Sequence, residues 1–361
     1  MKVKIPLSKP FIGQTEERLV LKALRSGRVT RGPVTAAFET EFAKFIGAKH
    51  GLALCNGTAA LHLALLAHGI GNGDKVITTP FTFVASANCI LYTGARPVFV
   101  DIERETYNID PSKIVEAVDE NTKAVLGVDV FGVPCDKKAI ADICEDHHLI
   151  HVEDACEAIG ATYNGKMVGS FSTSCFSFYP NKPITTAEGG MLLTDSGEIA
   201  KKVDALRNQG RSGGDWLSHE LIGYNYRISD IHAAIGLAQL RRIKAILDRR
   251  QRVAKMYSKH LCDTGVRPPL MIEGRSWFTY VIEIEDRDNV GRKMNESGIE
   301  CKPYFPPVHL QPPYRALGFK EGDFPVCEEV AAKTLALPFY TQMSEKDVKF
   351  VASNLRKCME S

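Results

Sequence analysis

Short apolar segments alternate with helix-like segments through the first half of the chain, and this alternation restricts the fold most strongly. Strands that alternate with helices of about 10–15 residues are typical of βαβ units and a parallel sheet. The strand candidates are apolar on both faces, as a sheet covered by helices on both sides requires. They are residues 51–55, 75–79, 97–101, 123–130, 149–154, 175–179 and 190–195. We therefore predict an α/β fold with a mostly parallel sheet. Because the last candidates follow one another closely, we also expect one antiparallel edge.

The pattern changes toward the C-terminus. A long helical pattern runs from residue 228 to about 260, and its basic stretch 241–252 most simply forms a solvated or subunit-facing surface. After Pro268 and Pro269, strands and helices mix as in a small α+β domain. The strand candidates there are 278–284 and 300–305, and the helix candidates are 288–297, 326–335 and 344–356. A chain of 361 residues suggests two domains at roughly 150 residues each. We predict a large domain at residues 1–250, including an N-terminal segment, and a small C-terminal domain at residues 251–361.

The composition argues against several classes of protein. The net charge is +2 with acids and bases mixed along the chain, which gives no basic stripe for nucleic acid. The apolar runs are far shorter than the ~20 residues that span a bilayer, so no membrane contact is expected. The first residues lack the apolar core of a secretory signal. The ten cysteines form no CxxC pair, so we expect reduced thiols and a cytoplasmic location.

A turn of small and hydroxyl residues, Asn56-Gly57-Thr58, separates a strand candidate from a helix candidate. Free backbone N–H groups and the helix dipole make such a helix start suitable for binding phosphate. An ordinary helix cap would use the same residue types. The chain has no GxxxxGK[ST] motif, so a P-loop is not expected.

Two acids, Glu153 and Asp154, end the strand candidate 149–154. In open parallel sheets, ligands bind outside the carboxyl ends of the strands. A carboxylate at this place could bind a metal, act as a base or pair with a cationic ring nitrogen. A helix cap is the plain alternative.

Lys182 lies between SFYPN and PITTAEGG, among aromatic, hydroxyl and small residues. A lysine in a partly apolar pocket can lose its proton and attack carbonyl groups. A solvated loop lysine is the common alternative, but the crowded flanks weigh against it. The pair Gly189-Gly190 permits a close backbone approach.

These three features together match pyridoxal 5′-phosphate (PLP). This cofactor needs a cradle for its phosphate, an acid for its pyridinium nitrogen and a lysine for its aldehyde. The turn at 56–58, Asp154 and Lys182 supply them in chain order. Phe83, near another strand end, could cover the ring, although an ordinary core phenylalanine would look the same.

At these positions the chain resembles the fold-type I PLP-dependent nucleotide-sugar aminotransferases over essentially its whole length. Motifs of that family recur in the right order, and together they make a specific match. They are NGTAALHLAL (56–65), PFTFVASANCI (80–90), VEDACEAIGA (152–161), SFYPNKPITTAEGGM (177–191), GYNYRISDIHAAIGLAQL (223–240) and PPVHLQPPY (306–314). Within the family it looks most like the GDP-perosamine synthase type, which aminates C4 of a 4-keto-6-deoxy sugar.

The resemblance implies the fold and the role of each matching residue. It implies a seven-stranded type of sheet with a small C-terminal domain, and a homodimer with a shared active site. Lys182 would bond to the cofactor and carry the proton, and Asp154 would keep the ring nitrogen protonated. The other implied contacts are Gly57, Thr58 and Ser177 with the phosphate, Phe83 with the ring face, Glu157 near the cofactor hydroxyl, Asn225 with the neighbouring subunit's phosphate, and Thr30 and His309 with the sugar nucleotide.

This chain departs from the family pattern in places. Many members have Gln at Glu157, and the family's TTGEGG reads TTAEGG here, with Ala187 in place of glycine. Because Ala disfavours positive φ, we expect the backbone there to differ slightly. Pro183 restricts Lys182 toward extended conformations. None of these changes removes a catalytic group.

The resemblance implies transfer of an amino group from L-glutamate to a 4-keto-6-deoxy nucleotide sugar, with 2-oxoglutarate as the second product. In the related sugar dehydratases a histidine replaces the lysine, so Lys182 favours transamination. A C3-keto-sugar or cyclitol aminotransferase would use the same machinery, and a PLP-binding regulator without turnover is an alternative of another class. The histidines 147, 148 and 151 resemble a metal cluster, but they span a helix end and a strand start and are not expected to converge. We predict no metal site.

Overall fold

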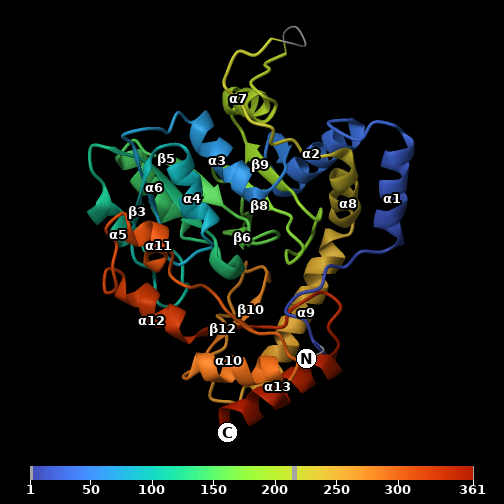
Figure 1. Ribbon diagram of the computed structural model, residues 1–361, viewed down its shortest axis with the longest axis vertical. Coiled ribbons are helices and arrows are strands. Elements are labelled where there is room, and N and C mark those ends of the chain that lie inside the picture. Colours follow the sequence, from blue (N-terminus) through green and yellow to red (C-terminus); the bar gives the residue numbers. More distant parts are fainter. Residues whose placement is uncertain (1–2, 214–217, 361) are drawn as a thin grey trace.

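A seven-stranded sheet forms the centre of the protein (Figure 1). The structure is a computed structural model that describes residues 3–213 and 218–360. The strand order is β1-β9-β8-β5-β4-β2-β3. The strands are β1 (His50–Leu54), β2 (Lys75–Thr78), β3 (Arg96–Phe99), β4 (Thr122–Val128), β5 (Ile150–Asp154), β8 (Thr173–Ser177) and β9 (Gly190–Thr194). The predicted α/β class with a mostly parallel sheet is confirmed.

The reversed strand lies inside the sheet. β9 pairs antiparallel with both β1 and β8, whereas the pairs β2–β3, β2–β4, β4–β5 and β5–β8 are parallel. The expected antiparallel edge is therefore wrong in position, because β1 forms that edge and β9 lies next to it. The connection between β8 and β9 contains no helix, and β9 runs antiparallel to β8.

Helices cover both faces of the sheet. Alternate residues of one strand enter different cores: Leu192 packs with the helix α3, whereas Met191 and Leu193 pack with Phe38 and Phe42 of α2. The predicted burial of both faces is therefore confirmed. The helices are α1 (Gln14–Arg25), α2 (Pro33–Ile46), α3 (Gly57–Ala67), α4 (Ala85–Tyr92), α5 (Pro111–Ala117), α6 (Lys137–Asp146), α7 (Gly197–Arg207) and α8 (Asp230–Leu240), with a short turn η1 (Val130–Gly132). A small hairpin of β6 (Thr162–Tyr163) and β7 (Lys166–Met167) follows β5.

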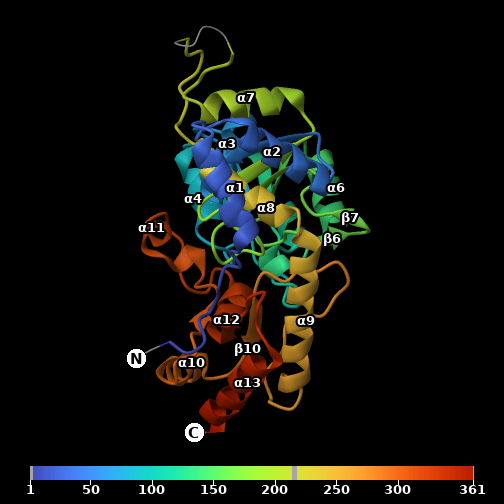
Figure 2. The same ribbon diagram turned by 90° about the vertical axis from the view of Figure 1, so that its right-hand side faces the viewer.

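The C-terminal part has its own small sheet and core. Antiparallel pairing gives the order β10-β12-β11, and the helices α10 and α13 lie beside this sheet at the lower end of the molecule (Figures 1 and 2). The elements are α9 (Ile243–Leu261), β10 (Tyr280–Glu283), α10 (Arg287–Glu296), β11 (Lys302–Pro303), η2 (Val308–Leu310), α11 (Pro312–Arg315), α12 (Pro325–Lys333), β12 (Thr334–Leu337) and α13 (Glu345–Glu360). Across the described residues, no helix is both long and apolar enough to cross a membrane.

Two helix predictions need correction. The long pattern from residue 228 is broken at Arg241 and Arg242, which separate α8 from α9. The side chain of Arg242 points back to the Phe11 carbonyl at 2.7 Å and to Glu16 at 2.7 Å, which ties the break to the N-terminal segment. The predicted helix 326–335 ends at Lys333, because the next residues pair as β12. The predicted division at residue 250 falls within α9, and it stays a prediction.

A buried cluster of charges joins the ends of β4 and β5. Lys137 Nζ lies 2.5 Å from Asp129 Oδ1 and 2.9 Å from Glu153 Oε1, and all three side chains are at most 1% exposed. Burial opposes the charge of Lys137, but the two carboxylates outweigh it and raise its pKa. Burial also raises the pKa of Glu153, and the Lys137 ammonium offsets part of this shift. Lys137 therefore compensates two acids beside the carboxyl end of β5.

Replacing this lysine is expected to destabilise the fold strongly. Lys137→Met leaves two buried carboxylates without a cation, which costs about 3–5 kcal/mol of unfolding free energy. Urea unfolding followed by circular dichroism measures the loss. The matched control is Lys138→Met, because Lys138 is 72% exposed and pairs with Asp142 on the same helix. Its expected change is below about 1 kcal/mol. Equal losses in both variants would contradict the role given to the buried cluster.

Candidate active site

The turn between β1 and α3 forms a cradle. Asn56 caps α3, since its side-chain oxygen accepts the Ala59 N–H at 2.8 Å. The helix-cap interpretation is therefore right for Asn56. Gly57 and Thr58 are the first residues of α3, where backbone N–H groups have no partner within the helix. The N–H groups of these residues can therefore bind an anion, although Asn56 also caps the helix.

Ser177, at the end of β8, faces this cradle. A Cβ added to Gly57 would lie 2.9 Å from Ser177 Cβ and 3.1 Å from Cys156 Sγ, so the three residues converge. Gly190 begins β9, and a Cβ there would lie 2.3 Å from the Asn56 carbonyl oxygen. Only glycine at these two positions lets β8 and β9 approach the turn so closely.

Asp154 is held rigidly at the carboxyl end of β5. Its side chain is buried, and Oδ2 accepts a hydrogen bond from Ser86 Oγ at 2.7 Å. Oδ1 accepts the Cys156 N–H at 3.1 Å. Two donors from different elements thus fix the carboxylate beside Cys156, which borders the cradle.

Lys182 lies in the connection from β8 to β9 and is largely covered. Nζ lies 3.7 Å from Glu157 Oε1 and 3.9 Å from the centre of the Phe278 ring, and 11% of the side chain is exposed. Glu157 Oε2 accepts the Phe131 N–H at 2.9 Å. Burial raises the pKa of Glu157, and the Lys182 ammonium and the Phe131 N–H act against this rise. A solvated loop lysine is excluded by these contacts.

The backbone after Lys182 takes a conformation that Ala normally avoids. Ala187 has φ +68°, and its N–H donates to Thr185 Oγ1 at 2.9 Å. Ala187 therefore adopts a left-handed turn in this chain, and whether the backbone differs from that of family members with glycine stays a prediction. Pro183 is buried directly after Lys182.

The other predicted site residues, Phe83, Asn225 and Thr30, are all exposed but lie on different segments. Phe83 is 61% exposed just before α4, which excludes the alternative of a core phenylalanine. Asn225 is exposed, and its neighbour Tyr226 accepts the Cys55 N–H at 2.9 Å, so this segment borders the cradle of the same chain. Thr30 is exposed and bridges to Ser229.

His309 is fully buried, which places it away from solvent. Its Nε2 lies 3.0 Å from Glu328 Oε1, and its ring packs edge-on against Phe324. Burial lowers the pKa of His309, and Glu328 partly counters this effect. Its expected contact with a sugar nucleotide stays a prediction.

Phe278 belongs to the site and was missed in the sequence. It precedes β10, in a segment that reads as an ordinary apolar strand. No local signal marks it, because its contact with Lys182 depends on packing between segments about a hundred residues apart.

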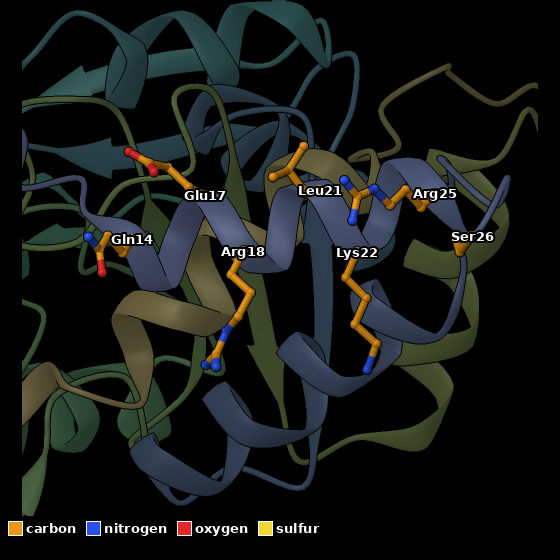
Figure 3. A pocket seen from close by; sticks show the side chains of 7 residues that line it. All are labelled: Gln14, Glu17, Arg18, Leu21, Lys22, Arg25 and Ser26. Atoms are coloured by element: carbon orange, nitrogen blue, oxygen red, sulfur yellow. The ribbon is translucent and has the colours of Figure 1, made fainter.

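Other candidate sites show no comparable arrangement. Across residues 3–213 and 218–360, no three His, Cys, Asp or Glu side chains gather as metal ligands. A hollow of about 610 Å³ lies along α1, where the side chains of one helix border it (Figure 3). Its lining residues are Gln14, Glu17, Arg18, Leu21, Lys22, Arg25 and Ser26. It contains no residue of the cradle, Asp154 or Lys182.

The residues present fit PLP. The cradle is open because position 57 has no Cβ. A buried carboxylate is fixed nearby, and a lysine is held against an acid and an aromatic ring. Asn181 Oδ1, beside the lysine, is buried without a partner. Fold and site together define a PLP-dependent aminotransferase.

The chain belongs to the DegT/DnrJ/EryC1/StrS aminotransferase family, whose model matches residues 10–356. It is 38% identical to GDP-perosamine synthase of Caulobacter vibrioides over 98% of this chain and 97% of that protein. Helicobacter pylori PseC, an aminotransferase involved in the biosynthesis of pseudoaminic acid, has a TM-score of 0.94, 29% identity and 99% coverage of both chains. The PLP form of the putative sugar aminotransferase Spr1654 from Streptococcus pneumoniae has a TM-score of 0.94 and 27% identity, over 99% of this chain and 98% of that one. The protein is thus a PLP-dependent sugar aminotransferase.

A side chain at position 57 is expected to close the cradle. In Gly57→Ala the new Cβ would lie 2.9 Å from Ser177 Cβ, so β8 or the turn must shift. Overpacking of this kind costs about 1–3 kcal/mol of unfolding free energy. Because the shift displaces the turn that would bind the phosphate, we expect weaker PLP binding. An absorbance titration of the cofactor-free protein measures the dissociation constant. Gly71→Ala is the control, because the nearest atom to its Cβ, the Thr93 carbonyl oxygen, lies 3.8 Å away. Unchanged affinity in Gly57→Ala would exclude this turn as the phosphate site.

Proposed function

We propose that this enzyme transfers the amino group of L-glutamate to C4 of a 4-keto-6-deoxy nucleotide sugar. The products are 2-oxoglutarate and a 4-amino sugar nucleotide of the GDP-perosamine kind. The observation that carries the proposal is the convergence of the cradle, Asp154 and Lys182 at the carboxyl ends of β1, β5 and β8. The similarity to GDP-perosamine synthase over nearly the whole chain supports C4 as the position.

The side chains divide the chemistry among them. When bound, PLP supplies an aldehyde that carries the amino group and a ring that accepts electrons. Lys182 would hold the cofactor through its aldehyde and would serve as the base and acid that moves the proton of the donor amino acid. Asp154, fixed by Ser86 and Cys156, holds the proton on the ring nitrogen. Gly57, Thr58 and Ser177 bind the phosphate, and the exposed ring of Phe83 covers one face of the cofactor.

Glu157 and two more distant residues complete the proposed site. Glu157 lies beside Lys182, and it would contact the hydroxyl of the cofactor. Thr30 and His309 are proposed to contact the sugar nucleotide. The buried position of His309 requires η2 or α12 to shift before its ring meets a substrate.

We also infer a homodimer in which each subunit completes the other's site. Asn225 is exposed at the border of the cradle and is proposed to reach the phosphate of the neighbouring subunit. Ile222, three residues earlier, is 94% exposed, and Leu221 is 45% exposed. Burial of these apolar side chains against a second copy would stabilise such a dimer.

A panel of keto-sugar nucleotides tests the substrate. With L-glutamate as donor, we expect rapid amination of GDP-4-keto-6-deoxymannose and at least tenfold slower amination of 3-keto nucleotides and keto-cyclitols. Such a ratio needs about 1.4 kcal/mol of differential transition-state binding. Mass spectrometry and NMR of the product identify the aminated carbon. Preferred amination at C3 or of a cyclitol would overturn the C4 assignment but keep the aminotransferase. Turnover of none of them, with normal PLP binding, would favour a regulator.

Removal of the lysine is expected to abolish turnover. Lys182→Ala loses the group that moves the proton, and acid–base catalysis of this kind contributes about 10²–10⁴-fold. Steady-state rates measure the loss. Borohydride reduction of the wild-type holoenzyme, followed by peptide mass spectrometry, should place PLP on Lys182. Lys202→Ala is the control, because Lys202 is half-exposed and pairs with Glu198 on α7. Full activity in Lys182→Ala, or PLP on another lysine, would refute the assignment.

A further inference from the structure

The amine of Lys182 has two close partners. Its ammonium lies between an acid and an aromatic ring, 3.7 Å from Glu157 Oε1 and 3.9 Å from the centre of the Phe278 ring. An ammonium over the face of a ring is attracted by the negative charge of that face. The attraction is stronger where water is excluded, and here Phe278 is 4% exposed and Lys182 is 11% exposed.

The backbone at Phe278 is held by a buried arginine. Arg250 is 3% exposed, and its guanidinium donates to the Trp277 carbonyl and to the Phe278 carbonyl, both at 2.6 Å. It also lies over the Phe339 ring. Desolvation lowers the pKa of Arg250 to about 9, so these hydrogen bonds compensate a costly burial. The backbone at Phe278 is therefore anchored independently of Lys182.

One short turn connects both partners of the lysine. The Phe131 N–H donates to Glu157 at 2.9 Å, and the Phe131 carbonyl accepts Arg275 Nη2 at 3.2 Å. The next carbonyl, of Gly132, accepts the Ser276 N–H at 3.0 Å. A Cβ on Gly132 would lie 2.2 Å from the Ser276 carbonyl oxygen. The turn η1 thus fixes Glu157 on one side and the segment that carries Phe278 on the other.

We propose that Phe278 is a positioning residue for Lys182. Its ring and Glu157 hold the ammonium that forms when Lys182 takes up a proton, so that the lysine stays beside the reacting atoms until it returns that proton. This proposal rests on the role of Lys182 given above. If the ring only filled space, a change in the charge of its face would not alter how strongly the ammonium of Lys182 is held.

Replacement of Phe278 by 3,4,5-trifluorophenylalanine at that single position separates charge from volume. Fluorine withdraws charge from the ring face and keeps the shape of the ring nearly unchanged. The first readout is the rate at which an amine-specific acylating reagent modifies Lys182 in the cofactor-free protein, measured by peptide mass spectrometry. Lys138, which is 72% exposed, serves as the internal reference. Because cation–π contacts are worth about 0.5–2 kcal/mol, we expect modification of Lys182 to rise by roughly 2- to 30-fold.

Two further variants complete the series. Phe278→Leu removes the ring and should raise the modification rate at least as much. Trifluorophenylalanine at Phe99 is the matched control. Phe99, the last residue of β3, is similarly buried at 5% exposure, but its ring packs against Phe319 and Tyr314. In the holoenzyme we expect the Phe278 variants to lower kcat, with the KM for the sugar nucleotide within about twofold, since the ring contacts the lysine.

An unchanged modification rate with the fluorinated ring would overturn the proposal, as would an equal rise in the Phe99 variant. A higher KM for the sugar nucleotide with an unchanged kcat would also overturn the proposal. The ring would then act on substrate binding. The borohydride experiment fails separately: PLP on another lysine refutes the role of Lys182, whereas PLP on Lys182 with no effect of fluorination refutes only the role of Phe278.

Discussion

The register across four neighbouring strands determines where the cradle, Ser177 and Asp154 of the candidate site lie. Gly190 pairs with Leu54 on one side and with Ser177 on the other, and Asp154 pairs with Cys175 two residues before Ser177. This row brings the start of the cradle, the serine and the acid to one edge of the sheet. A slip of one residue would turn each side chain to the opposite face. The missing side chain of Gly190 is therefore a condition of the site, because it lets β9 lie between the other two strands at the closest point.

The two acids at the end of β5 show how the same register separates structure from chemistry. Glu153 and Asp154 are adjacent, so their side chains point to opposite faces of the sheet. Glu153 meets Lys137 and the Gly169 N–H in the buried cluster, whereas Asp154 meets Ser86 and the residues that border the cradle. The charge cluster fixes β5 on one face of the sheet, and Asp154 on the other face is available to bind a ligand. The sequence names both acids but does not say which of them faces the ligand.

Local patterns predicted the strands and most helices well, because apolar periodicity reports which face of each element is buried. The cradle, Asp154 and Lys182 were also selected from the sequence as groups that one cofactor needs, and their roles stay predictions. Long-range pairing was not readable. The position of β9 inside the sheet, the strand β12 after Lys333 and the contact of Phe278 with Lys182 all depend on segments distant in sequence. The break at Arg241 depends likewise on the N-terminal segment that binds Arg242.

Two of the eight non-glycine residues with positive φ in the described chain lie close to the lysine. Phe131 has φ +52° and Ala187 has φ +68°, although side chains with a Cβ disfavour this region by roughly 1–2 kcal/mol. Such conformations persist only where the surroundings hold them, and they gather at sites that need an unusual geometry. At Phe131 the turn directs an N–H to Glu157 and a carbonyl to Arg275 at the same time. At Ala187 it returns the chain from Lys182 to Gly190. These two residues therefore constrain the loop that carries Lys182 and the position of its partner Glu157.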